Sequence, residues 1–64
     1  MKPGDLMKTY GCLLFDRPYS SLANVVGHLK SDEVVLILEV NLQDVHVLSR
    51  LGKAWIPVSR LRQT

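Results

Sequence analysis

Three side chains in this sequence could serve as a nucleophile or a base: Cys12, His28 and His46. They stand 16 and 18 positions apart, and no Ser-His-Asp or Cys-His motif surrounds them. Zinc sites usually contain close pairs of ligands, which this spacing does not provide. Cys12 precedes two leucines and is best explained as a small buried hydrophobe, and His46 alternates with two valines on the outer face of a strand. We therefore predict no catalytic residue, no metal site and no cofactor.

The carboxylates give no acid–base pair either. Asp32 and Glu33 are adjacent at the expected start of a strand, where acids commonly solvate a turn, and Asp16 ends an earlier apolar run. A chain of 64 residues has little volume for a deep cleft that would raise a carboxyl pKa. The four glycines are far apart and do not form a phosphate-binding loop. The sequence therefore predicts a protein that is not an enzyme.

A binding surface is the stronger prediction, and Trp55 is its centre. Three cations flank it in the sequence, namely Arg50, Lys53 and Arg60. An indole among cations can stack on a nucleic-acid base or on a side chain of a partner. The simpler alternative is that Trp55 packs in the core or at its rim, against the first strand. Tyr10 and Tyr19 extend the candidate surface only if the early excursion of the chain folds over it.

The charge of the chain is unevenly distributed. The formal net charge is +2, but residues 1–44 hold four basic and six acidic residues, a balance of −2. Residues 45–64 hold four basic residues and no acid, a balance of +4. A basic end can face nucleic acid or an acidic partner, and it is equally typical of an ordinary solvated surface.

Length and composition predict one small domain over residues 1–64. The chain is 47% hydrophobic and 22% charged, which excludes a disordered tail. One cysteine cannot form an intramolecular disulfide, and a domain of this length buries only about 60% of its unfolded surface. We therefore expect barrel closure and association between copies to supply stability. Because no run approaches ~20 apolar residues and the N-terminus lacks a signal-peptide core, we expect a cytoplasmic protein without membrane contact.

Valine, leucine and isoleucine dominate the apolar residues, which favours strands. The predicted strands are residues 6–10, 12–15, 34–40, 45–50, 54–56 and 61–62. The run 34–40 is apolar on both faces until Glu39, as expected of a strand that is buried on both sides or lies at the heart of a small barrel. A loop is expected at 17–21, a four-residue hairpin loop at 41–44 and a second tight turn at 51–53.

Two further segments complete this prediction. Residues 58–60 can form one turn of tight helix. Residues 22–31 are predicted as a long, partly ordered excursion, with a single helical turn there as the alternative. Five or so short strands with tight turns are typical of a small closed barrel.

The final third of the chain resembles the end of a Src-homology-3-like barrel. The resemblance is carried by a strand, a tight turn and then the run Gly-Lys-Ala-Trp-Ile-Pro-Val-Ser-Arg-Leu over residues 52–61. It implies an all-β fold, a five-stranded barrel with one long early loop and a short tight-helix turn before the last strand. Residues 2–6, 37–40 and 55–61 also resemble short uncharacterised barrel proteins encoded by tailed bacteriophages, which implies the cytoplasm of a host cell.

The proline-rich ligand of the peptide-binding members of that family is not expected for this chain. Those proteins have a tyrosine just after the tight-helix turn, where this chain has Arg60, and a pair of tryptophans where it has Val45 and His46. Four aromatic residues are too few for a proline-rich groove. A weaker resemblance, over residues 51–56, is to the Sm-like RNA-binding barrels, but the first Sm motif is not visible.

We therefore expect a small non-enzymatic β-barrel interaction module. Its expected partner is a protein, including a second copy of the chain, and no small-molecule substrate is inferred. The alternative is a nucleic-acid-binding barrel, Sm-like or of another kind, that uses the basic C-terminal third.

Overall fold

The fold is all-β, with five antiparallel strands and one short 3-10 helix. The computed structural model describes residues 1–18 and 22–63. The elements are β1 (Leu6–Phe15), β2 (Val25–Asn41), β3 (Asp44–Ser49), β4 (Gly52–Pro57), η1 (Val58–Arg60) and β5 (Leu61–Gln63). In the described part of the chain, no helix has the length and apolar character needed to cross a membrane.

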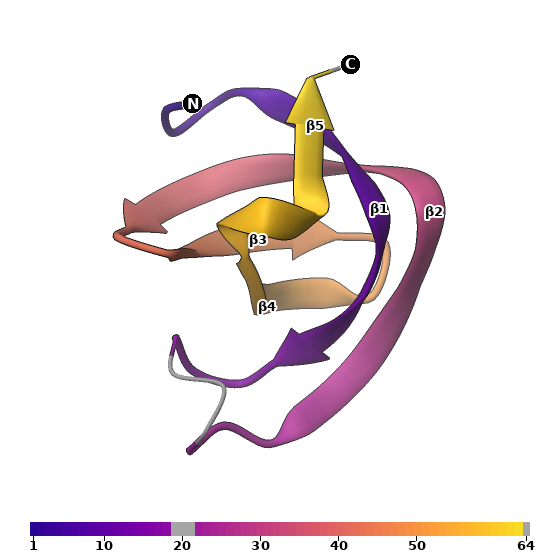
Figure 1. Ribbon diagram of the computed structural model, residues 1–64, viewed down its shortest axis with the longest axis vertical. Helices are drawn as coiled ribbons and strands as arrows, with labels where there is room; N and C mark the ends of the chain where they lie inside the picture. The colour runs from indigo at the N-terminus through magenta and orange to yellow at the C-terminus, as the bar shows by residue number, and fades with distance from the viewer. Residues whose placement is uncertain (19–21, 64) are drawn as a thin grey trace.

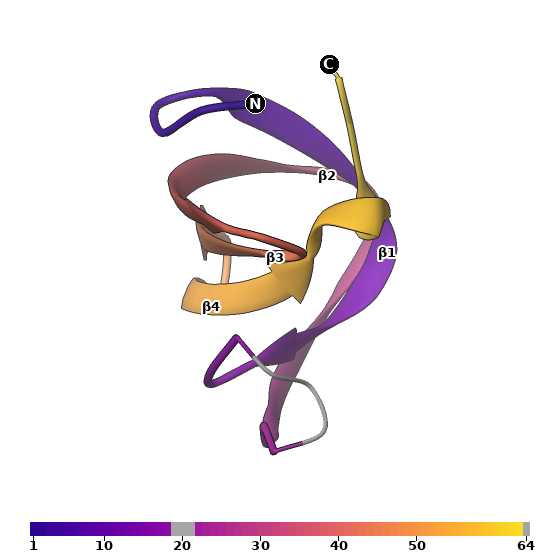
Figure 2. The same ribbon diagram turned by 60° about the vertical axis from the view of Figure 1, so that its left-hand side comes forward.

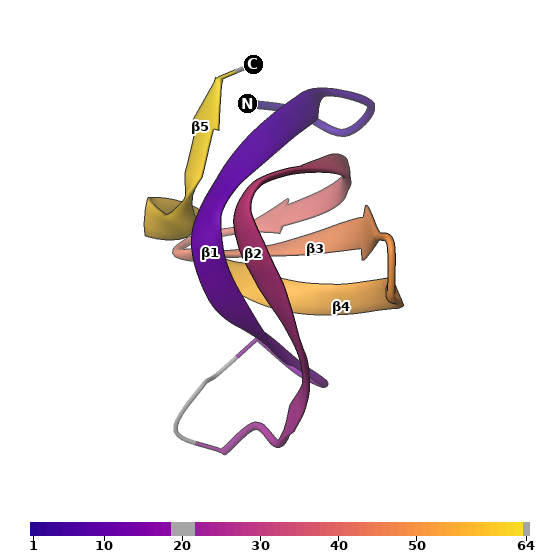
Figure 3. The same cartoon turned by 90° about the vertical axis from the view of Figure 1, so that its right-hand side faces the viewer.

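The strands form a partial ring (Figure 1). Their order is β2-β3-β4-β1-β5, and β2 also pairs with β1. The 17 residues of β2 bend around the molecule, so that its first part pairs with β1 and its last part with β3 (Figure 3). β4 meets β1 at a single position, where Trp55 is opposite Phe15. The ring is therefore incomplete between β4 and most of β1.

The core fills the inside of this ring. It follows from strict alternation along the strands, because Val45 and Val47 of β3 and Ala54 and Ile56 of β4 all face inward. The buried hydrophobic residues are Met7, Cys12, Leu14, Leu29, Val35, Ile37, Val45, Val47, Ala54, Ile56 and Leu61. The buried Thr9 hydroxyl donates a hydrogen bond of 3.0 Å to the carbonyl of Lys30, which satisfies a polar group inside.

In the C-terminal half the predicted strands and the tight-helix turn are confirmed, but both predicted turns differ from those in the structure. The tight-helix turn at residues 58–60 is η1, and it carries the chain from β4 back to β1, where β5 pairs with the first strand (Figure 2). The hairpin between β2 and β3 is tighter than expected, because Asn41 pairs with Asp44 and only Leu42 and Gln43 remain in the turn. Leu42 has φ +53 and is 86% exposed there. The second turn lies at residues 50–51, one position earlier than predicted.

The predictions for the N-terminal half need three corrections. The runs 6–10 and 12–15 form one strand, because Gly11 with φ +91 continues the chain instead of ending it. The excursion predicted for 22–31, with its helical alternative, is wrong from Val25 onward, since β2 begins there and pairs with β1. The long early loop that was predicted before the second strand therefore ends before Val25. Residues 19–21 of the loop predicted at 17–21 lie outside the described residues.

The third correction concerns the central strand. The run 34–40 is not buried on both sides: Val35 and Ile37 face the core, but Val34 and Val40 are exposed. A single curved sheet this small covers only its concave face, so the outer face of β2 stays in contact with solvent.

Candidate functional site

Trp55 lies on the outer face of the sheet and not in the core. Its neighbours Ala54 and Ile56 point inward, so the indole points outward from β4, where it is half-buried. The strand register places it opposite His46 of β3, and the two rings stack with centroids 4.8 Å apart and planes 13° from parallel. The prediction that His46 occupies the outer face of a strand is thus confirmed. Glu39 of β2 is opposite His46, so it is the next residue across the strands from the stacked Trp55–His46 pair.

Lys53 is on the same face of β4 as Trp55. It is two residues away along the strand and exposed, and its partner across the strand pair is Leu48 of β3. The structure therefore places Lys53 and Trp55 together on one surface, as the candidate binding surface requires.

Arg50 is engaged within the chain. From the turn between β3 and β4 its Nε donates to Glu33 Oε1 at 2.6 Å, and the backbone N–H of Lys30 donates to Glu33 Oε2 at 2.6 Å. The hydrogen bond from Arg50, and to a smaller extent the one from the Lys30 N–H, hold the pKa of Glu33 below its ordinary value. The same bond to Glu33 raises the pKa of Arg50. The sequence analysis placed Glu33 at a solvated turn and missed its pairing with Arg50, because a partner 17 positions away leaves no local signal.

Arg62 of β5 is engaged in the same way. It forms an ion pair with Asp32, and its guanidinium carbon lies 5.3 Å from the centre of the Tyr10 ring. Two of the four cations in the basic C-terminal third are therefore neutralised by acids of β2. Among the described residues, 1–18 and 22–63, no acid lies within ion-pair distance of Lys53 or Arg60.

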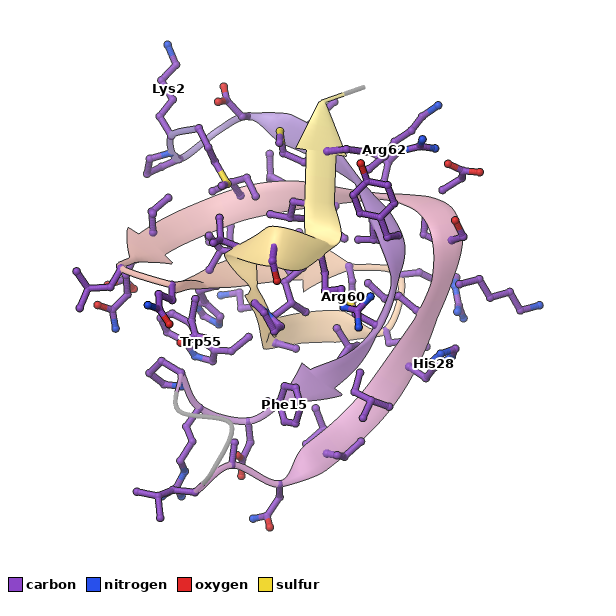
Figure 4. The ribbon with its side chains drawn as sticks, viewed as in Figure 1. Lys2, Phe15, His28, Trp55, Arg60 and Arg62 are labelled. Carbon is purple, nitrogen blue, oxygen red and sulfur yellow. The ribbon has the colours of Figure 1, made fainter. Side chains whose placement is uncertain are left out.

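Arg60 lies on η1 and not on β4 with Trp55 and Lys53, but it is close to Pro57 of β4 and to Phe15, the residue opposite Trp55. It projects from η1 and helps to line a hollow of about 290 Å³. The other lining residues are Cys12, Leu13, Phe15, His28 and Pro57. Figure 4 shows Arg60 in front of β1, Phe15 at the end of that strand and His28 on β2. Tyr19, the fifth residue of the candidate surface, lies outside the described residues.

The candidate nucleophile and bases are divided between two surfaces. Cys12 and His28 line the hollow, whereas His46 is on the outer face beside Trp55. The prediction that Cys12 is buried is confirmed, and burial raises the pKa of its thiol, partly opposed by the positive charge of Arg60. In the ranges 1–18 and 22–63, no group of three His, Cys, Asp or Glu side chains is placed to hold a metal ion.

A row of leucines crosses the outer face and was missed by the sequence analysis. Leu6 of β1 is opposite Leu36 of β2, and Leu36 is opposite Leu48 of β3. Leu6 is 57% exposed and Leu48 42% exposed, with Leu36 half-buried between them. We call these three residues the leucine row. Lys53 is opposite Leu48 and continues the row onto β4, so the leucine row and the stacked Trp55–His46 pair share one face.

Comparison of the chain with known protein families, with curated proteins and with solved structures finds no match.

Proposed function

We propose that this protein is a small non-enzymatic interaction module that binds a protein partner through the outer face of its sheet. The leucine row carries this proposal. Three large aliphatic side chains in register on adjacent strands form a continuous apolar strip, and such strips on small proteins mark contact surfaces. Burying an exposed leucine contributes on the order of 1.5–3 kcal/mol, so the row can supply much of the free energy of an association.

A second copy of the chain is the partner that we propose first. Leu36 is the middle of the row and a leucine stands on either side of it, so the apolar strip is the same when read from either end. A surface of this kind is self-complementary under a two-fold axis, as an isologous contact requires. The two outer faces would then pack as stacked sheets about 10 Å apart. Association would also add buried apolar surface to a domain whose length allows only a small core.

The finer description of the fold belongs to the same proposal. We infer that the partial ring is a Src-homology-3-like barrel, because η1 stands between β4 and β5 and β5 returns to pair with β1. An origin in a tailed bacteriophage, and a location in the cytoplasm of the host cell, rest on the resemblance of residues 2–6, 37–40 and 55–61.

Sedimentation equilibrium of the wild type and of a Leu48→Lys variant tests the function. The wild type should dimerise with increasing concentration, and Leu48→Lys should weaken the dimer by about tenfold or more, because a cation would then face the apolar row of the other copy. Leu42→Lys is the matched control, since Leu42 is also exposed but lies in the β2–β3 turn, and it should leave the dimer unchanged. A wild type that stays monomeric, or a Leu48→Lys dimer of unchanged strength, would contradict the proposal.

Nucleic-acid binding is the second candidate, and the stacked Trp55 and His46 rings beside Lys53 favour it. Against it, Arg50 is already paired with Glu33, and Glu39 extends the aromatic row with a negative charge. Immobilised single-stranded DNA should retain the protein at low salt if this candidate is correct. Retention should fall steeply with added salt and disappear when Lys53→Glu and Arg60→Glu are combined. Absence of retention at low salt would remove the candidate.

A further inference from the structure

One edge of β1 is uncovered over five residues. The strand pairs with β2 along its whole length, from Leu6 to Phe15. Its other edge pairs with β5 at Met7–Thr9 and with β4 at Phe15. Between these two contacts, none of the described strands pairs with that edge over residues 10–14. The backbone N–H and C=O groups of an uncovered edge are a template for a further strand.

The hollow lies beside this uncovered edge. Cys12, Leu13 and Phe15 of β1 form one part of its lining, and Pro57 and Arg60 come from the opposite side of the gap in the ring. Its volume of about 290 Å³ is at the lower limit of ligand pockets. It therefore suits one or two side chains of a peptide better than a whole cofactor.

The lining has a definite charge preference. Arg60 is the cation of the lining and His28 is a second polar side chain, and none of the described residues that line the hollow is an acid. Arg60 is exposed and, among residues 1–18 and 22–63, has no ion-pair partner. Burial raises the pKa of Cys12, which also lines the hollow, and the positive charge of Arg60 offsets part of that rise. Leu13, Phe15 and Pro57 add apolar walls beside Arg60, so a carboxylate next to an apolar group is complementary to the hollow.

We propose that the uncovered edge of β1 binds an extended peptide segment of another protein, with a glutamate or aspartate side chain of that segment in the hollow. The peptide backbone pairs with residues 10–14, its carboxylate faces Arg60, and an apolar neighbour packs against Phe15. This site shares no residue with the leucine row, so it does not depend on self-association. Main-chain pairing would give most of the affinity, and the hollow would select the side chain.

Nuclear magnetic resonance titration with three pools of synthetic hexapeptides tests this site. The peptides are acetylated and amidated, the third residue is fixed as Glu, Gln or Lys in the respective pool, and the other positions are drawn from Val, Ile, Thr, Phe and Tyr. The Glu pool should shift the backbone amide signals of residues 10–14 at the lowest concentration. The Gln pool should need about fivefold more peptide, and the Lys pool still more, because the ion pair with Arg60 is lost or reversed.

An Arg60→Gln variant should bind the Glu and Gln pools alike, whereas a Lys53→Gln variant, the matched control on the outer face, should behave as the wild type. The proposal is overturned if the Glu pool leaves the amides of residues 10–14 unchanged at millimolar concentration, or if the Glu and Lys pools bind equally. It is also overturned if these amides shift with protein concentration alone, because a second copy would then occupy the edge.

Discussion

Replacing Leu29 with alanine should lower the free energy of unfolding by about 3 kcal/mol, the largest effect that we expect from a single substitution in this chain. Leu29 is 0% exposed and lies in the middle of the core, opposite Cys12 on β1. Alanine would remove most of its buried side chain and leave a cavity between β1 and β2. A domain of 64 residues has a total stability of only about 3–10 kcal/mol, so the loss is about a third of that stability or more.

Urea denaturation followed by the fluorescence of Trp55 measures this loss, because the indole is half-buried against His46 in the folded state. Val26→Ala is the matched control. Val26 is on the same strand but 56% exposed, so its truncation should cost less than about 0.5 kcal/mol. Similar losses in the two variants would mean that this part of β2 is a loosely packed excursion and not a core strand.

The segment around Leu29 also explains where sequence reasoning failed. Val25, Val26 and Leu29 recur at a helical spacing, and the alternation of a strand is concealed because Gly27 occupies an inward-facing position without a side chain. The space is filled by other parts of the chain: a Cβ atom added to Gly27 would lie 3.1 Å from a methyl group of Leu51 and 3.2 Å from one of Leu14. Neither contact can be predicted from local sequence, because both depend on how distant strands meet.

The C-terminal half was predictable for the opposite reason. Alternation in 45–50, the glycine at the second turn, and Pro57 before η1 are local signals, and the structure follows them. The placement of the candidate site residues needed more than these signals. Whether Trp55 stacks on His46 depends on a turn at residues 50–51 that sets Ser49 opposite Gly52, and a shift of one residue would separate the two rings.

The charge distribution shows the same limit. The excess of +4 over residues 45–64 is real in the sequence, but it does not become a basic surface of that strength. Arg50 forms an ion pair with Glu33, and Arg62 forms one with Asp32, because the bend of β2 brings its acids to the ends of β3 and β5. Of the four, Lys53 and Arg60 have no acidic partner among the described residues, and they lie on different elements, β4 and η1. This is why we favour two separate protein-binding surfaces over one nucleic-acid surface.

Replacing Gly11 with alanine should lower the free energy of unfolding by about 2 kcal/mol. Gly11 has φ +91, a conformation that L side chains rarely adopt, and it follows the register shift that lies between Lys8 and Tyr10. A Cβ atom there would come within 3.3 Å of the backbone nitrogen of Ser31 and 3.6 Å of the carbonyl oxygen of Leu29. These are backbone atoms of a paired strand, so they cannot turn away as a flexible side chain could.

Gly52→Ala separates the two causes of this loss. Gly52 has φ +113, but nothing lies within 4 Å of an added Cβ atom, so its substitution adds the backbone strain alone. We expect a loss of about 1 kcal/mol at Gly52 and about twice that at Gly11, both read from the urea midpoint at constant slope. Equal losses would show that the close approach of β1 to β2 costs nothing. In that case the whole loss at Gly11 would come from its positive φ.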